Sequence, residues 1–159
     1  MSILFCSFFS NFFDSIDSLS ESRLQALRSL AIMSPYRARV RLIRQLAEAA
    51  ALPASVRVGT IHQFQGQQAD LVILDTTIAD RLVTSFLCRE SETFSAETLL
   101  NVALTRGRAK VIGLGSAEAV QALPAETFLK TVFRHLQRDG LIVDVDRFLY
   151  PEPADTLHI

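Results

Sequence analysis

The sequence has few of the features that mark disulfide-rich, metal-binding or strongly basic proteins. Its 159 residues include two cysteines, three histidines and no tryptophan, and the formal net charge is −1. The cysteines form no Cys-x-x-Cys pair and have no histidine at ligand spacing, so we expect no metal site and buried thiols in a reducing, cytoplasmic compartment. Because no overall basic field is present, contact with a polyanion requires a local patch.

A membrane-spanning segment is also lacking, and no membrane partner is expected. The apolar stretch at residues 3–13 is shorter than the ~20 residues of a membrane helix and has no basic n-region or clear cleavage site. We favour an element that docks on the core over a targeting segment; a third interpretation is packing against a neighbour that the chain lacks. The expected organisation is an apolar extension at 1–17, one globular domain at 18–149 and a tail at 150–159.

Two common nucleotide-binding motifs are absent. No Gly-x-x-x-x-Gly-Lys-Ser/Thr segment occurs, so the chain itself lacks the phosphate cradle of a P-loop enzyme. Gly113-Leu114-Gly115 is no dinucleotide fingerprint, because Glu118 stands in the place of the third glycine. Any nucleotide chemistry therefore needs other residues or a second polypeptide.

Short apolar runs of strand length alternate with helical segments. Strands are expected at 30–33, 56–58, 71–74, 111–114 and about 141–148, and helices at 18–30, 36–50, 98–106 and 124–138, with 76–97 mainly loop. Ser34 and Pro35 are expected to cap and open the second helix, and Gly107 to end the third. This alternation is typical of an α/β fold, a parallel sheet with helices on both faces.

In such sheets, ligands bind beyond the carboxyl ends of the strands. Ser34 and Thr60 each follow a predicted strand, so we expect both at that edge. Arg106 precedes a strand instead, and it reaches the same edge only if its helix runs back across it.

Arginines gather at two places in the sequence. Arg106 and Arg108 follow an apolar helix, where cations stabilise the last carbonyls and the helix dipole by ~0.3–1 kcal/mol. The alternative is an arginine finger, a guanidinium that stabilises transition-state charge on a γ-phosphate. Arg37, Arg41 and Arg44 share one face of the helix at 36–50, and this stripe is either a solvated surface or a phosphate-tracking patch.

A glutamine-rich loop lies between two predicted strands at residues 60–70. Gln65-Gly66-Gln67-Gln68 offers amides that donate and accept hydrogen bonds, and a glycine that permits close approach of backbone to a ligand. Thr60 offers a hydroxyl and an N–H to a phosphate. Phe64, within this polar loop, is expected to anchor it to the core.

Three segments in order give the chain a family resemblance. Residues 31–39 (AIMSPYRAR), 58–74 (VGTIHQFQGQQADLVIL) and 100–108 (LNVALTRGR) resemble motifs IV, V and VI of the second RecA-like domain of superfamily 1 helicases. The similarity is to the branch that includes the nonsense-mediated-decay helicase and the Okazaki-fragment nuclease-helicase, and it covers about residues 18–116.

The resemblance implies roles for individual residues. Arg106 is implied as the catalytic arginine that reaches the γ-phosphate. Nucleotide binding is implied for Gly66, Gln68, Arg106 and Arg108, and nucleic-acid binding for Ser34, Tyr36, Thr60, His62 and Gln65. Gln65 and Gly66 would shape the loop that links the two sites.

The sequence departs from the family pattern at several positions. Gln68 replaces a glutamate that contacts the nucleotide ribose, His62 replaces a common aspartate, and Gly107 replaces an alanine, which we expect to loosen the helix end. Leu99 and Leu100 stand where basic residues often precede motif VI. The P-loop, the Mg²⁺-binding acidic motif and the Gln-Tyr-Arg segment of the family are missing.

The resemblance therefore implies the C-terminal half of an ATP-dependent helicase. Its partners would be an N-terminal P-loop RecA-like domain and single-stranded DNA or RNA. ATP and Mg²⁺ are expected only in the complete two-domain enzyme; alone, this chain should bind neither with more than weak affinity and should hydrolyse no ATP. The alternatives are a non-catalytic module that binds nucleic acid or protein with the same fold, and a degenerate reading frame.

Overall fold

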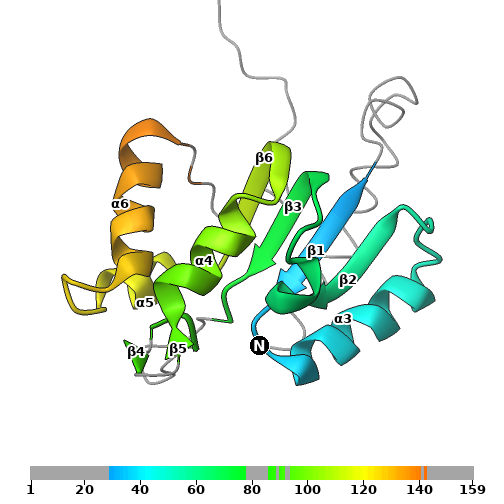
Figure 1. The fold of residues 1–159 in the computed structure, drawn as a ribbon, viewed down its shortest axis with the longest axis horizontal. Coiled ribbons are helices and arrows are strands. Elements are labelled where there is room, and N and C mark those ends of the chain that lie inside the picture. Colours follow the sequence, from blue (N-terminus) through cyan, green and yellow to red (C-terminus); the bar gives the residue numbers. More distant parts are fainter. Residues whose placement is uncertain (1–28, 78–85, 89, 92–93, 141, 143–159) are drawn as a thin grey trace, which may run out of the picture.

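The apolar runs predicted as strands form one parallel sheet. The computed structural model of the chain describes residues 29–77, 86–88, 90–91, 94–140 and 142. Within these residues the sheet has the order β2-β1-β3-β6 (Figure 1), formed by β1 (Leu30–Ser34), β2 (Val56–Thr60), β3 (Ala69–Asp75) and β6 (Gly107–Leu114). β4 (Glu90–Ser91) and β5 (Phe94–Ser95) form a separate antiparallel pair.

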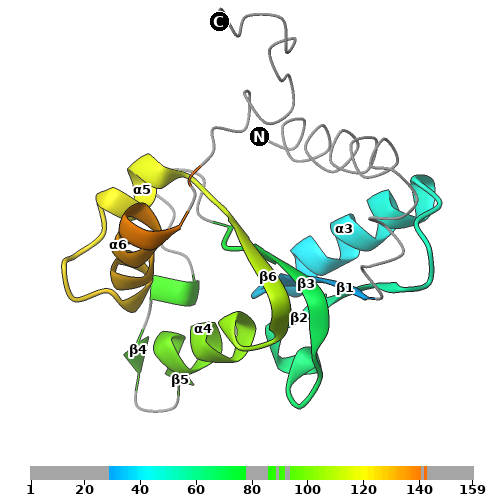
Figure 2. The ribbon, with the colours of Figure 1, turned by 90° about the horizontal axis from the view of Figure 1, so that it is seen from above.

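Helices cover both faces of the sheet. α3 (Arg37–Ala49) packs against β1 and β2 on one face, whereas α4 (Ala96–Leu104) lies on the opposite face (Figure 2). The short 3₁₀ helices η1 (Ile61–Phe64) and η2 (Phe86–Cys88) contact α4, as does α6 (Phe128–Asp139), and α5 (Ala117–Gln121) packs against α6. The predicted α/β fold is confirmed, and the arrangement is RecA-like.

An apolar cluster lies on each face of the sheet. Ile32 and Ile73 point toward α3 and pack with Ile43, while Met33 and Val72 point to the other side, toward α4. Successive side chains of β1 and β3 thus alternate between two buried clusters. Burial on both faces explains why the central strands read as continuous apolar runs.

Several predicted boundaries are wrong by a few residues. Ser34 is the last residue of β1, where it pairs with Thr60, so it does not cap a helix; Tyr36 is the N-cap and α3 begins after Pro35, at Arg37. Gly107 does not end α4 but begins β6.

The C-terminal helical region also differs from its prediction. The five-residue helix α5, which the periodicity did not indicate, is capped by the Ser116 hydroxyl, which accepts from the Ala119 N–H at 3.1 Å. α6 begins at Phe128 because Pro124 opens a turn, closed by a hydrogen bond from the Thr127 N–H to the Pro124 carbonyl. Almost all of the predicted helix at 18–30 and of the predicted strand at 141–148 lies outside the described residues; at the end of that helix, Leu30 belongs to β1 instead.

Candidate functional site

The candidate residues divide between the two edges of the sheet. Ser34 and Thr60 pair with each other at the carboxyl ends of β1 and β2, as predicted. Arg106 lies at the opposite edge, next to Gly107, which pairs with Ala69 at the amino ends of β6 and β3. A five-residue strand rises about 13 Å between its end residues, so these two groups of residues face different sides of the molecule. The segment from Thr60 to Ala69 connects the edges.

Arg106 contacts the glutamine loop at the amino edge. Its Nε donates to the Val102 carbonyl (3.0 Å), its Nη2 to the Thr105 hydroxyl (2.9 Å) and its Nη1 to the Gln67 carbonyl (3.3 Å). A guanidinium has five N–H donors, so one donor on each terminal nitrogen remains. Arg106 is half-buried, and no carboxylate among the described residues lies within ion-pair distance of it. The side chain is therefore oriented by neutral acceptors, and a pair of its donors is left for an anion.

Main-chain atoms also join the helix end to the loop. The Ala69 N–H donates to the Arg106 carbonyl at 3.0 Å. The Thr105 hydroxyl, which accepts from Arg106, also lies 2.7 Å from the Asn101 carbonyl. The helix end and the loop thus hold Arg106 from both sides.

Arg108 reaches the neighbouring glutamine. Its Nε donates to the Gln68 Oε1 at 3.1 Å, and its Nη1 lies 3.9 Å from the Asp70 Oδ1. The pairing of β3 with β6 shifts register between Ala69 and Leu71, which introduces a bulge after Gly107. Bulges re-aim side chains locally, and this one lies where Arg108 turns toward Gln68.

The glutamine loop is closed by its own hydrogen bonds. The Gln67 N–H donates to the Phe64 carbonyl (2.9 Å), and the Gln67 Nε2 donates to the Gln63 carbonyl (3.0 Å). Gly66 has a φ of +79°, which side chains rarely adopt. Gln65, Gly66 and Gln68 are exposed, whereas Phe64 is buried and anchors the loop as predicted.

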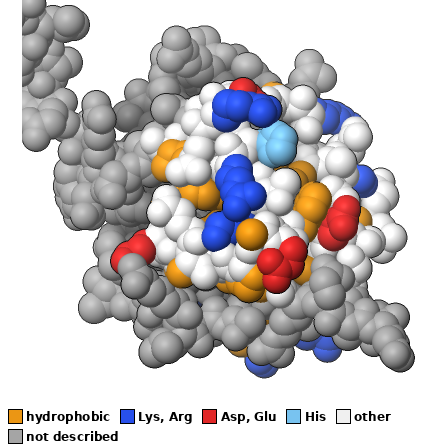
Figure 3. Space-filling model, turned by 90° about the vertical axis from the view of Figure 1, so that its left-hand side faces the viewer, with side chains coloured by type: hydrophobic (Ala, Val, Ile, Leu, Met, Phe, Trp, Pro, Cys, Tyr) orange, Lys and Arg blue, Asp and Glu red, His pale blue; other side chains and the backbone are white. Residues whose placement is uncertain are grey.

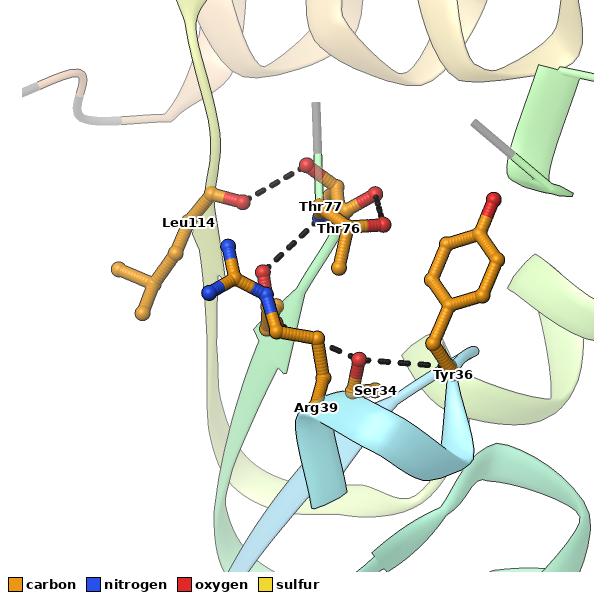
Figure 4. Close-up of polar contacts among 7 residues, drawn as sticks. Ser34, Tyr36, Arg39, Thr76, Thr77 and Leu114 are labelled. Carbon is orange, nitrogen blue, oxygen red and sulfur yellow. Dashed lines mark hydrogen bonds and ion pairs between the residues drawn. The ribbon is translucent and has the colours of Figure 1, made fainter. Parts of the chain in front are cut away.

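The carboxyl edge carries a cluster of polar groups (Figure 4). The Ser34 hydroxyl donates to the Asp75 Oδ2 at 3.3 Å, and the Arg39 Nε lies 3.5 Å from the same oxygen. The Thr77 N–H donates to the Asp75 Oδ1 at 2.9 Å, and the Thr76 hydroxyl donates to the Leu114 carbonyl at 2.7 Å. This cluster joins the ends of β1, β3 and β6 to the first turn of α3.

Ser34 lies inside this cluster and not on the surface. The residue is fully buried, and its hydroxyl donates to Asp75, so in this structure it positions a carboxylate. Asp75, which is 3% exposed, was missed in the sequence because a single carboxylate at the end of an apolar run has no recognisable spacing. Thr77, two residues after Asp75, has a φ of +56°, an unfavourable value for a β-branched residue.

Burial raises the pKa of the Asp75 carboxyl above its ordinary value of 3.8, and it outweighs the lowering effects of the Thr77 N–H, Arg39 and Ser34. A raised pKa means that the folded state holds the proton more tightly than the unfolded chain. The stability this provides is complete below pH 3.8 and is lost as the pH rises through the folded-state pKa.

We therefore expect Asp75→Asn, which cannot titrate, to gain stability relative to wild type as the pH rises above about 4. Urea denaturation at a series of pH values measures the difference in unfolding free energy between the variant and wild type. The test is how this difference changes with pH, not its pH-independent part. Glu126→Gln, which removes an exposed carboxylate, is the control. A difference that falls with rising pH would mean that the ion pair with Arg39 dominates over burial.

The remaining candidate residues follow the carboxyl ends of β1 and β2. The Thr60 N–H donates to the Gln63 Oε1 at 2.8 Å, as in a capping box. This N–H was expected to be offered to a phosphate, and in the structure it is already used. His62 in η1 is exposed, and Tyr36 is half-buried above the carboxyl edge (Figure 4). Thr60, Tyr36 and His62 thus surround the carboxyl edge, while Gln65 leads away from it toward the amino edge.

The arginine stripe of α3 is exposed, but its members differ. Arg44 donates from Nε and Nη2 to the Val58 carbonyl, which satisfies an acceptor on β2. Arg37 and Arg41 are exposed.

The side of the molecule that lies on the left in Figure 1 and carries α6 shows basic, acidic and apolar side chains intermixed (Figure 3).

No group of three histidine, cysteine or acidic side chains that could hold a metal ion occurs among the residues that the structure describes. Within the same residues, no helix is both long and apolar enough to cross a membrane. Cys88 is half-buried, and Cys6 lies outside the described part.

Comparison with known proteins gives related helicases. The chain is 28% identical over 135 residues to DNA polymerase alpha-associated DNA helicase A of Schizosaccharomyces pombe, an alignment that covers 85% of this chain and 19% of that protein. It is 31% identical over 121 residues to the DNA replication ATP-dependent helicase/nuclease DNA2 of Mus musculus, covering 73% of this chain and 10% of the relative. It is 30% identical over 98 residues to DNA polymerase alpha-associated DNA helicase A of Saccharomyces cerevisiae, covering 58% of this chain and 13% of that protein.

These relatives are much longer proteins, and the chain spans between 10% and 19% of their lengths. A profile of the AAA domain family matches residues 9–118, well over half of this chain. The chain therefore belongs to the AAA domain family and is a domain of the superfamily 1 helicase type.

Proposed function

We propose that this chain is the second RecA-like half of an ATP-dependent helicase that acts on single-stranded nucleic acid. The observation that carries the proposal is the Arg106 guanidinium, held by Val102, Thr105 and Gln67 with a pair of donors left over. Arginine stabilises charge on a transferring phosphoryl group when its fork is fixed in advance. The amino edge of the sheet is then the wall that closes on ATP.

The other wall comes from a P-loop domain, because this sequence has no P-loop. That partner would hold the phosphates and Mg²⁺ in its own loop. In this chain, Arg106 would contact the γ-phosphate, Arg108 would add positive charge, and Gln68 would face the ribose with an amide in place of the family's carboxylate. The exposed Gly66 leaves the loop backbone open to a ligand.

Nucleic acid would contact the opposite, carboxyl edge. Thr60 supplies a hydroxyl, Tyr36 an aromatic ring, and His62 an exposed imidazole. Aromatic rings stack on bases and hydroxyls donate to phosphates without sequence preference. The separation of the two sites supports a coupled motor, because the segment from Thr60 to Ala69 is the covalent connection between them.

Complementation tests the proposal. Mixed with the P-loop RecA-like domain of its own helicase, the chain should restore ATPase activity that single-stranded oligonucleotide stimulates, while each polypeptide alone turns over no ATP. Phosphate release measures the rate. Failure of every oligonucleotide, DNA or RNA, to stimulate a stable complex of the two polypeptides would overturn the assignment.

A non-catalytic binding module is the second candidate, favoured by the Gln68 amide where the family has a carboxylate. It predicts that the chain alone binds single-stranded oligonucleotide with a steep salt dependence, and that adding the P-loop domain restores no turnover. Fluorescence anisotropy across a range of salt concentrations measures the first, and the complementation assay measures the second.

A further inference from the structure

Arg57, in the edge strand β2, has no role in the site described above. Its Nη1 donates to the Gln67 Oε1 (2.5 Å) and its Nη2 to the Gln68 carbonyl (2.9 Å). Its guanidinium carbon lies 5.5 Å from the centre of the Phe64 ring, within cation–π distance. The side chain is thus held by both the loop and the core. It comes from β2, which β1 separates from β3 in the sheet.

Three arginines from two parts of the fold, β2 and the residues around the start of β6, meet at the same dipeptide. Arg57 contacts both Gln67 and Gln68, Arg106 donates to the Gln67 carbonyl, and Arg108 donates to the Gln68 Oε1. We call Arg57, Arg106 and Arg108 the arginine cluster. All three members contact this one dipeptide, whereas the chain as a whole has a net charge of only −1.

The charge of the arginine cluster is largely uncompensated. Among the described residues, Asp70 is the only carboxylate within ion-pair distance of any member, and it faces Arg108 at 3.9 Å. Arg57 and Arg106 donate only to neutral oxygens. Like charges repel one another, and here three of them contact one dipeptide. An anion with several charges removes that repulsion and gains charge-assisted hydrogen bonds as well.

The free donors fit a chain of phosphate groups. Two of the five guanidinium donors of Arg57 are used by the loop, which leaves three, and Arg106 keeps two. Guanidinium forks bind phosphate oxygens in pairs. A single phosphate would engage one fork, whereas a triphosphate is long enough to engage more than one.

We propose that Arg57 is a phosphate-binding residue, and that the arginine cluster binds the phosphate chain of a nucleoside triphosphate through all three members. This inference rests on the proposed function, since it extends the amino-edge site from Arg106 and Arg108 to β2. It also gives the Gln67–Gln68 dipeptide a role, because the dipeptide holds together three cations that would otherwise move apart.

The chain by itself is sufficient for the test. Amide signals in an NMR titration report weak binding of inorganic tripolyphosphate, of ATP and of adenosine. Tripolyphosphate and ATP should shift the same amides at Gln67, Gln68 and Ala69 with millimolar affinity, and adenosine should shift none of them. Adenosine alone shifting these amides would mean that the surface recognises the base, which would overturn the proposal.

Variants separate binding by Arg57 from its structural contacts. Arg57→Ala should weaken tripolyphosphate binding about tenfold, the loss of roughly one charged hydrogen-bond pair, while Arg57→Lys should retain most of the affinity. Gln67→Ala, which removes an acceptor of Arg57 but no charge, should weaken binding less than Arg57→Ala. Arg134→Ala, an exposed arginine of α6, removes the same charge elsewhere and should change nothing.

Two results would overturn the proposal. One is equal affinity of the Arg57→Ala and Arg134→Ala variants; the other is no binding of tripolyphosphate or ATP by the wild-type chain. Either leaves the complementation assay to decide the proposed function independently, because that assay depends on Arg106. If complementation fails while tripolyphosphate still binds, phosphate binding by the arginine cluster stands and the helicase assignment is wrong.

Discussion

Arg106→Ala should lower kcat for ATP hydrolysis by about 10³-fold or more in an enzyme completed by the P-loop domain. The variant removes the one guanidinium that the helix end and the glutamine loop jointly orient at the amino edge. The backbone link between Ala69 and residue 106 uses main-chain atoms and survives the change. Single-turnover phosphate release measures the chemical step directly. Affinity for single-stranded oligonucleotide should stay within about twofold, because that contact lies at the opposite edge.

A conservative variant distinguishes geometry from charge. Arg106→Lys keeps the charge but loses the planar fork, so we expect it to recover only a small part of the lost rate. Arg134→Ala on α6 is the control for removal of an exposed arginine. Turnover by Arg106→Ala within tenfold of wild type would contradict the assignment of this residue and leave its role as a cation at a helix end.

Much of the sheet follows from local sequence. Residues 30–33 and 71–74 are apolar throughout, and strands of that type are central in parallel sheets, where both faces are covered. The alternation with helices fixed the fold class for the same reason. Phe64 was also predictable as an anchor, because an aromatic side chain in a polar loop loses most by exposure.

The candidate site was less predictable because it depends on pairing between distant segments. Nothing local to Arg106 shows that Gln67 is its acceptor, 39 positions away. Asp75 acquires its role only because β1 and β3 are neighbours and bring Ser34 beside it, 41 positions away. Arg57 looks like an ordinary solvent-facing residue of an edge strand until the fold places its guanidinium against the Phe64 ring and Gln67.

Gly107 shows how a local prediction fails for a reason outside its own segment. A glycine after an apolar helix is typical of a helix terminus, and it was expected to loosen the end of α4. In the folded chain it is the first residue of β6, and a Cβ built there would lie 2.6 Å from Val111 Cγ2 and 2.8 Å from the Lys110 carbonyl oxygen. Glycine is needed because, at this register shift, the Lys110 carbonyl and the Val111 side chain lie close to the start of the strand.

Gly107→Ala should therefore destabilise the protein by ~1–3 kcal/mol, the usual cost of forcing an extra methyl group into a packed position. One of the two close contacts is with backbone, so rotation of a side chain alone cannot relieve the clash. A chain of this length should lose roughly 2–4 °C in Tm for each kcal/mol. Urea and thermal denaturation followed by circular dichroism measure the loss.

Gly113→Ala provides a matched control in the same strand. Nothing lies within 4 Å of a Cβ built at Gly113, so the added methyl group meets open space. Because glycine in a strand interior is itself unfavourable by roughly 0.5–1 kcal/mol relative to alanine, this variant should be neutral or slightly stabilising. If both variants unfold at the same urea concentration, the backbone around the bulge adapts freely. Arg108 would then reach Gln68 through its own flexibility, not through a strand held in place by Gly107.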